Sequence, residues 1–234
     1  MFINENIVAK KYNNIYVSQG YVVIQNFLQD EYVENFYNFL NDMNPNWWYH
    51  TSVTEVGKDE IRNFQDEKTQ KIITDKRNSA LKLFSQSKDF SFSFYRTLGN
   101  HYETCYCKLC QFNKDIIENS NFKKLVEEVT GEIELKLGTY FYTEYKPGDF
   151  LYPHTDSPNG RVAIVLHMTK NWEPWYGGNL NLLDSKWQNI KATLVPKFNS
   201  LTIMKIKEDV NPHFVEYIPP NVTEKRYGMV CWFN

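Results

Sequence analysis

The feature that most constrains the fold is a change in the pattern of residue types at Gly131. Beyond it, short segments rich in β-branched and aromatic residues alternate with turn residues. Many short strands at such spacing favour an antiparallel sandwich or barrel. We therefore predict an α+β fold whose mainly β core is a jelly roll, that is, a double-stranded β-helix, backed by N-terminal helices. The six strand segments are EIELKLGTYFYTEY, RVAIVLHMT, GGNLNLL, SLTIMKI, HFVEYI and RYGMVCWF.

The N-terminal part of the chain has the longer periodicity that is typical of helices. In the segment LQDEYVENFYNFLND, apolar residues recur at a spacing of three and four, and Gln29 or Asp30 can begin the helix. No internal repeat or Pro/Gly linker divides the chain, so the sequence predicts a single domain over residues 1–234. The remaining N-terminal predictions are a strand over 15–28, a loop over 44–52, a helix over 65–90, a strand over 90–97 and one or two helices over 114–130.

Charge and hydropathy exclude several classes of partner. The formal net charge is −2 and the pI is near 6.2, which argues against nucleic acid as a partner because non-specific binders carry a basic face. No apolar run approaches the ~18 residues of a membrane span. The N-terminal MFINENIVAKKY lacks the apolar core of a signal peptide, so the expected localisation is cytoplasmic. The sequence predicts no particular oligomeric state.

Two histidines and one aspartate suggest a metal site. His154 and Asp156 are two positions apart, and in extended backbone such residues face the same side. His213 stands at the start of a later predicted strand. Two histidines and a carboxylate from neighbouring strands form the facial triad of non-haem Fe(II) sites. A His-x-Asp pair in a turn can also serve hydrogen bonding alone, so the surrounding sequence has to decide.

That surrounding sequence resembles the 2-oxoglutarate- and Fe(II)-dependent dioxygenases, and within them the prolyl hydroxylases. The resemblance covers roughly residues 16–43 and 135–234, and the middle, 45–130, matches nothing we know in that family. It implies a helix-rich support region over 1–130 and a catalytic jelly-roll core over 131–234. The matching segments are VVIQNFLQDEYVENFYNFL, Tyr145-Lys-Pro-Gly148, His154-Thr-Asp156-Ser-Pro-Asn-Gly160, Gly177-Gly178-Asn-Leu180, Asn211-Pro-His213-Phe-Val215 and RYGMVCWF from Arg226.

The resemblance implies that His154, Asp156 and His213 are the catalytic Fe(II) ligands. The cofactor and co-substrates would be Fe(II), 2-oxoglutarate and O2, with ascorbate as the expected reductant. Family members couple oxidative decarboxylation of 2-oxoglutarate, which yields succinate and CO2, to hydroxylation of an unactivated C–H bond. The iron supplies the difficult chemistry, and the protein supplies binding and orientation.

The far carboxylate of 2-oxoglutarate needs a cation, and the resemblance places Arg226 there. The planar guanidinium can hold a carboxylate through two charge-assisted hydrogen bonds. Lys225 is the competitor, although alternation along a strand turns it to the other face. Tyr145 occupies the position of a tyrosine that hydrogen-bonds the co-substrate, a role that Tyr142 or Tyr140 could share.

Three further residues have expected roles near the site. His167 is in the place of a tyrosine that faces the 2-oxoglutarate tail, although a lone histidine in an apolar strand is often a core residue. Trp232 is expected to pack against the iron-binding wall. Arg161 either contacts substrate at the mouth of the site or is a solvated loop charge.

A second candidate metal site lies outside the motifs of this family. His101, Cys105, Cys107 and Cys110 offer one imidazole and three thiols within ten residues. Such a set can bind structural zinc, but the Cys-x-Cys-x2-Cys spacing is tighter than in the usual zinc knuckles. Reduced, metal-free thiols are the alternative, since disulfides are rare in reducing compartments.

The expected substrate is a prolyl residue in a peptide or protein. Aromatic-lined grooves suit proline, and the loops are rich in aromatic residues. The alternatives are a hydroxylase of a free amino acid or small metabolite and, from another class, a non-catalytic jelly-roll or zinc-bearing binding module. These loop aromatic residues are Trp47, Trp48 and Tyr49 and, near the mouth of the barrel, Trp172, Trp175 and Tyr176.

Overall fold

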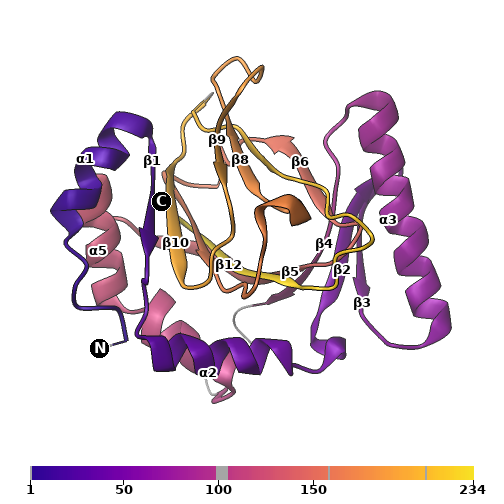
Figure 1. Ribbon diagram of the computed structural model, residues 1–234, viewed down its shortest axis with the longest axis horizontal. Helices are drawn as coiled ribbons and strands as arrows, with labels where there is room; N and C mark the ends of the chain where they lie inside the picture. Colours follow the sequence, from indigo (N-terminus) through magenta and orange to yellow (C-terminus); the bar gives the residue numbers. More distant parts are fainter. Residues whose placement is uncertain (1, 99–104, 158, 209) are drawn as a thin grey trace.

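A curled antiparallel sheet forms the centre of the molecule, and helices cover its outside (Figure 1). The computed structural model describes residues 2–98, 105–157, 159–208 and 210–234. The strands are β1 (Tyr21–Gln25), β2 (Tyr49–Thr54), β3 (Gly57–Arg62), β4 (Phe92–Leu98), β5 (Leu137–Tyr145), β6 (Phe150–His154), β7 (Val162–His167), β8 (Leu180–Leu183), β9 (Ile190–Leu194), β10 (Ser200–Lys205), β11 (His213–Val215) and β12 (Arg226–Phe233). The helices are α1 (Ala9–Gln19), α2 (Asp30–Asn41), α3 (Glu67–Ser87), α4 (Lys108–Phe112) and α5 (Ser120–Thr130), with short turns η1 (Pro45–Trp47), η2 (Asn113–Ile117) and η3 (Pro174–Tyr176).

The order of the strands explains the curl of the sheet. Hydrogen-bonded neighbours run β1-β10-β7-β12-β5-β4-β6-β11-β8-β9, and β2 adds to β4 with β3 beyond it. Strand β4 pairs with both β5 and β6, so it joins the larger group of strands to the smaller one. The mainly β core backed by N-terminal helices is therefore as the sequence predicts.

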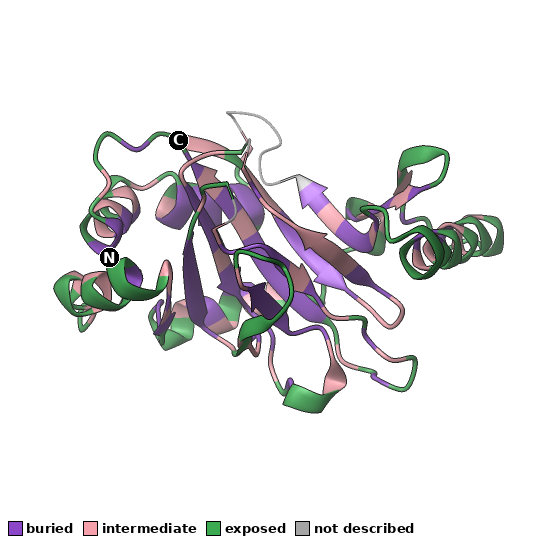
Figure 2. Cartoon of the chain, turned by 90° about the horizontal axis from the view of Figure 1, so that it is seen from above, coloured by how far each residue is buried: buried purple, intermediate pink, exposed green. Residues whose placement is uncertain are grey.

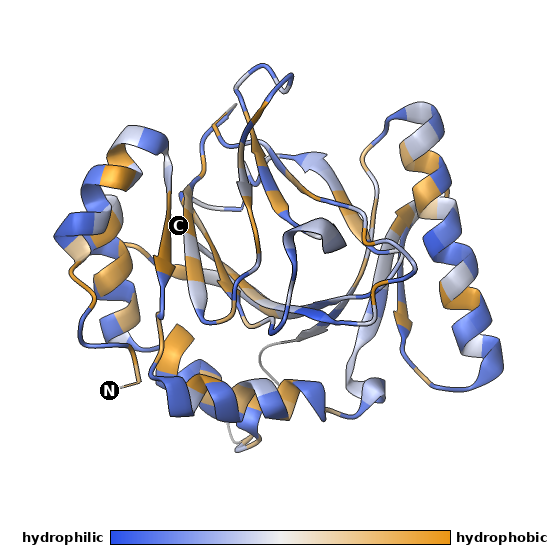
Figure 3. Ribbon diagram, in the orientation of Figure 1, coloured by the Kyte–Doolittle hydropathy of each residue, from blue (hydrophilic) through white to orange (hydrophobic). Residues whose placement is uncertain are grey.

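Alternation along the strands divides the apolar residues between two cores. Residues on the outer face of β5 and β12, such as Tyr142 and Met229, pack against the helices. Residues on the inner face, such as Tyr145 and Val215, pack inside the curl. Each helix has an apolar face towards the sheet and a polar face towards solvent. Figure 2 shows the outward faces of the helices exposed and the central sheet buried, and Figure 3 shows the same division in hydropathy.

Helix α2 illustrates how the pattern produces the packing. Its residues Val33, Phe36 and Leu40 recur at helical spacing and are buried. Phe36 stacks on Phe112 at a centroid distance of 3.8 Å and contacts Tyr142 of β5. Helix α2 thereby covers the outer face of the sheet behind the candidate site.

Two N-terminal predictions differ from the structure. The strand expected over 15–28 begins only at Tyr21, because residues up to Gln19 complete α1 and Gly20 ends that helix with a positive φ of 77°. The loop expected over 44–52 contains the start of β2, which pairs with the polar edge strand β3. Strand β3, GKDEIR, has no apolar alternation because it is largely exposed, so the sequence carried no signal for it.

Among the described residues, no helix combines the length and the apolar character that crossing a membrane would require.

Candidate active site

Two adjacent strands and the turn after one of them bring His154, Asp156 and His213 together. His154 ends β6 and is directly opposite His213 of β11 in the strand register. The Nε2 atoms of His154 and His213 lie 3.5 and 3.8 Å from the two carboxylate oxygens of Asp156. One ligand atom from each residue lies within 4.8 Å of the others. The three sequence-predicted iron ligands thus face one point.

Hydrogen bonds orient both imidazoles for metal binding. Nδ1 of His154 lies 2.9 Å from the carbonyl oxygen of Tyr152, and Nδ1 of His213 lies 3.0 Å from that of Asn211. A carbonyl can only accept, so Nδ1 carries the proton and the Nε2 lone pair faces Asp156. Such outer hydrogen bonds are typical of metal-binding histidines.

The electrostatics of the triad also suit a cation. Burial alone would raise the pKa of Asp156, but its contacts with His154 and His213 outweigh burial and lower the pKa to about 2. Burial, together with the neighbouring His154, lowers the pKa of His213 to about 4. At neutral pH the imidazole of His213 is therefore neutral and Asp156 is a carboxylate. Together with Nε2 of His154 they provide the nitrogen and oxygen donors of a facial Fe(II) site.

The triad opens into a cavity of about 310 Å³ inside the curl of the sheet. Its wall is mostly apolar and draws on both halves of the chain. Five aromatic side chains other than tyrosine line it: Phe90, Phe92, Phe94, Phe141 and Trp232. Trp232 also lies next to Asp156, since its indole contributes to the low pKa of that carboxyl group.

Arg226 projects into the same cavity as a buried cation. Only 4% of the residue is exposed, and it forms no ion pair with a carboxylate of the described chain. Its guanidinium lies 4.7 Å from the ring of Tyr145, the residue opposite it in the register of β12 and β5. Burial lowers the pKa of Arg226, and it raises that of Tyr145. A buried charge without an anionic partner fits a site for a carboxylate of a ligand.

The alternatives to Arg226 and Tyr145 lie on the other side of the sheet. Lys225 reaches Glu144 at 3.4 Å and is partly exposed. The hydroxyl of Tyr142 donates to Asn113 Oδ1 over 2.6 Å, and that of Tyr140 donates to Glu118. Strand alternation therefore leaves Arg226 and Tyr145 as the pair that faces the cavity.

His167 is not among the described residues of the cavity wall. It is 1% exposed on β7, and its Nε2 lies 3.2 Å from the Thr202 hydroxyl. Burial and then the charge of Arg226 lower its pKa to about 3. The imidazole is thus neutral and close to Arg226, and contact with the co-substrate stays a prediction.

Several expectations for the mouth of the site do not agree with the structure. Trp48 is buried in the outer core, and none of the six loop aromatics named above is among the described residues of the cavity wall. Arg161 binds Glu132 and backbone carbonyls near the C-terminus, and it too is absent from that wall. Aromatic content marks large buried side chains but does not say which core they enter.

Sequence reasoning missed two cations of the wall, Arg96 of β4 and Lys58 of β3. Arg96 holds Glu60 through two hydrogen bonds of 3.0 and 2.9 Å, and its guanidinium lies over Phe141. The alternation of FSFSFYRT already placed Phe92, Phe94 and Arg96 on one face, so this signal was present in the sequence. Lys58 had no such signal because β3 itself was not predicted.

Comparison with known proteins now adds to the geometry. Residues 140–234 match the family model described as the 2OG-Fe(II) oxygenase superfamily. This part of the chain is similar to the members of that superfamily. The match includes the triad, Arg226 and Tyr145, and it confirms the resemblance and the enzyme class expected from the sequence. A search of curated protein sequences finds no match.

Solved structures similar to this chain confirm the jelly-roll fold over nearly its whole length. One is an oxidoreductase of the 2OG-Fe(II) oxygenase family from Burkholderia pseudomallei, with a TM-score of 0.62, 11% identity and coverage of 100% of this chain and 93% of that one. A prolyl-4-hydroxylase from Pseudomonas putida has a TM-score of 0.57 and 14% identity, with coverage of 97% of this chain and 98% of that one. A third is a prolyl hydroxylase from Trichoplax adhaerens, solved with a peptide fragment of the oxygen degradation domain of hypoxia inducible factor. It has a TM-score of 0.56 and 16% identity, with coverage of 96% of this chain and 88% of that one.

The residues present fit the cofactors of this superfamily. The nitrogen and carboxylate donors of the triad suit Fe(II). The buried guanidinium of Arg226, which forms no ion pair among the described residues, suits a carboxylate of 2-oxoglutarate. Both groups face one cavity, so metal and co-substrate can bind side by side.

Proposed function

We propose that the protein hydroxylates an unactivated C–H bond of a prolyl residue in a peptide or protein, with release of succinate and CO2. The observation that carries the proposal is the single cavity that holds the triad, the unpaired Arg226 and an aromatic wall. Aromatic faces suit the flat proline ring. The likeness to two prolyl hydroxylases, one of them solved with a peptide, supports this substrate class.

Each part of the cavity has a distinct task in this proposal. His154, Asp156 and His213 hold Fe(II), which when bound supplies the coupling of O2 reduction and 2-oxoglutarate decarboxylation to C–H oxidation. Arg226 binds the far carboxylate and so fixes the orientation of the co-substrate. Tyr145, whose raised pKa keeps its hydroxyl protonated, stands beside it as a hydrogen-bond donor. Ascorbate is the proposed reductant that keeps the iron ferrous between turnovers.

The apolar wall has a second task, the exclusion of water. Phe92, Phe94 and Phe141 surround the polar groups and leave them few solvent contacts. Electrostatic interactions are stronger in such surroundings, and side reactions with water are suppressed. The wall therefore both receives the substrate and protects the reacting centre.

A hydroxylase of a free amino acid or small acid is the second candidate. Lys58 and Arg96 bring two more cations to the cavity wall, beyond the one that 2-oxoglutarate needs. A substrate with its own carboxylate could bind them. Arg96 already holds Glu60, so Lys58 is the cation better placed for this role.

Turnover with two panels of compounds tests the proposal. Purified protein with Fe(II), 2-oxoglutarate, ascorbate and O2 is offered proline-containing peptides and, separately, free amino acids and small acids. Succinate is measured, and the products are fragmented in a mass spectrometer to locate the added oxygen atom. We expect oxygen on a ring carbon of proline in a peptide.

Control variants separate a wrong substrate from a wrong chemistry. Two remaining ligands bind iron poorly, so His154→Ala and Asp156→Ala should abolish succinate formation, including the slow formation expected without substrate. Oxygen found only on a free metabolite would support the second candidate. No succinate from the iron-loaded protein under any condition would favour a non-catalytic binding module.

A further inference from the structure

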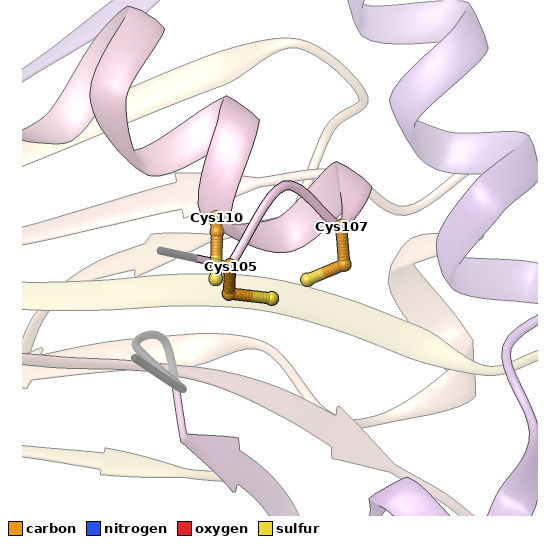
Figure 4. A group of neighbouring side chains, drawn as sticks. All are labelled: Cys105, Cys107 and Cys110. Atoms are coloured by element: carbon orange, nitrogen blue, oxygen red, sulfur yellow. The ribbon is translucent and has the colours of Figure 1, made fainter. Parts of the chain in front are cut away.

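Three cysteines form a cluster outside the iron cavity. Figure 4 shows Cys105, Cys107 and Cys110 around one turn of chain at the start of α4, with the side chain of Cys105 between the other two. Their Sγ atoms all lie within 4.8 Å of one another. Cys110 is buried, and the other two are half-buried, so the cluster is accessible from one side.

The chain that carries the cluster is fixed to the oxygenase sheet. Phe112 stacks on Phe36 of α2, and Asn113 accepts the buried hydrogen bond of Tyr142. Tyr142 is on the outer face of β5, whereas its neighbours Phe141 and Thr143 line the iron cavity on the inner face. The segment with the cluster therefore packs on the outer face of the sheet, whereas the triad faces the cavity on the inner side.

We propose that Cys105, Cys107 and Cys110 bind a structural Zn²⁺ as thiolates. Soft sulfur donors select zinc, whereas the nitrogen and oxygen donors of the triad suit Fe(II), so the two sites discriminate by ligand type. Zinc is tetrahedral, and three thiolates fill three of its four positions. His101, the fourth ligand considered from the sequence, lies outside the described residues.

Convergence of three thiols favours a metal over a disulfide. Any disulfide within the cluster would leave the third thiol beside it unused. A bond between Cys105 and Cys107 would close a loop of only a few residues, and short loops give little stabilisation. A metal uses all three sulfurs and adds its binding free energy to that of folding.

The zinc would link Cys105, which follows β4 in the sequence, to helix α4. Cys105 comes shortly after β4, which contributes Phe92, Phe94 and Arg96 to that wall. Cys110 belongs to α4, which is held against β5. A metal bound by these cysteines would hold Cys105 against α4 on the outer face of the sheet, without contact with substrate or iron.

Metal analysis of the whole chain tests this inference independently of turnover. Protein is purified under reducing conditions without chelator, loaded with Fe(II), and its zinc and iron are counted by mass spectrometry. We expect one zinc per chain in the wild type, none in Cys107→Ser, and iron binding unchanged in that variant. The matched control is Cys231→Ser, since Cys231 is a buried cysteine of β12 outside the cluster and should leave the zinc in place. His154→Ala should lose iron and keep zinc.

Cobalt gives a spectroscopic test of the ligands. Co²⁺ in place of zinc should show thiolate-to-metal charge transfer and the intense visible bands of tetrahedral cobalt in the wild type but not in Cys107→Ser. If this variant does not fold, thiol labelling of the wild type replaces it, and zinc should then slow the labelling of the cluster until a chelator is added.

Three results would each overturn the inference. The first is wild-type protein that binds no zinc when zinc is offered under reducing conditions. The second is zinc content that Cys107→Ser leaves unchanged. The third is thiol labelling of the cluster that added zinc does not slow.

Discussion

Replacement of Arg226 by methionine separates binding of the co-substrate from the integrity of the fold. The guanidinium is buried, faces the iron cavity and has no carboxylate partner in the described chain. In the free protein it carries a desolvation cost, which lowers its pKa. An apolar side chain of similar length removes this cost, and replacement of buried ionic groups by apolar ones is often neutral or stabilising by ~1–4 kcal/mol. Arg226→Met should therefore be at least as stable as the wild type without 2-oxoglutarate.

The loss should appear only when 2-oxoglutarate is present. A carboxylate left without its partner in a buried site costs ~2–5 kcal/mol. At about 1.4 kcal/mol per factor of ten, the dissociation constant should rise by about 30-fold to several thousandfold. Arg226→Lys keeps the charge but loses the two-pronged geometry, so its affinity should lie between those of the other two proteins.

Calorimetric titration of 2-oxoglutarate into anaerobic, Fe(II)-loaded protein measures the affinity, and thermal unfolding with and without 2-oxoglutarate measures the stability. At a hundredfold excess over the wild-type dissociation constant, 2-oxoglutarate should stabilise the wild type by ~2.7 kcal/mol and Arg226→Met by ~0.9 kcal/mol or less. Lys225→Ala is the matched control, because Lys225 is the neighbouring cation that points outward to Glu144. Wild-type affinity in Arg226→Met, or a large loss in Lys225→Ala, would refute the assignment.

Two further predictions concern stability. Burial, with the charges of Arg77 and Lys146, lowers the pKa of His50 to about 3. Below about pH 6.5 the unfolded chain therefore binds a proton at His50 that the folded chain does not bind, and the folded state loses stability. Between pH 7.5 and 5 the free energy of unfolding of the wild type should fall by ~2 kcal/mol more than that of His50→Gln in denaturant titrations. Equal slopes with pH in the two proteins would contradict this. Tyr142→Phe should cost ~1 kcal/mol, because it removes the buried hydrogen bond from the Tyr142 hydroxyl to Asn113 Oδ1, whereas Tyr140→Phe, at a more exposed hydroxyl, should cost less. The reverse order in chemical denaturation would be evidence against the anchoring of η2 to β5 through this bond.

The sequence predicted most strands of the jelly-roll half because they have a local signal, whereas β6 and β9 are not among the six predicted segments. Strand β12 alternates between residues that enter the cavity and residues that enter the outer core, and this period of two is visible in RYGMVCWF. The pairing of His154 with His213 was accessible only through the resemblance, because it depends on strands that are distant in sequence.

The N-terminal half was less predictable for physical reasons. Residues 15–19 have high β propensity yet complete α1, because Tyr16 is buried in the outer core as part of a helical face. Strand β3 is polar and exists through its pairing with β2. The cations of the cavity wall were missed for the same reason, since the position of Lys58 depends on that pairing.

Strand β4 has a consequence for how this enzyme can be divided. It comes from the N-terminal part of the chain, yet it is inserted between β5 and β6 of the oxygenase domain. A cut between residues 130 and 131 would leave both of those strands with unpaired backbone edges and would open one side of the cavity. Residues 140–234 contain the catalytic motifs, but we infer that they are not a unit that folds by itself. A search for the smallest active fragment would therefore have to keep β4, and transplanting the motifs alone onto another protein would not transfer the activity.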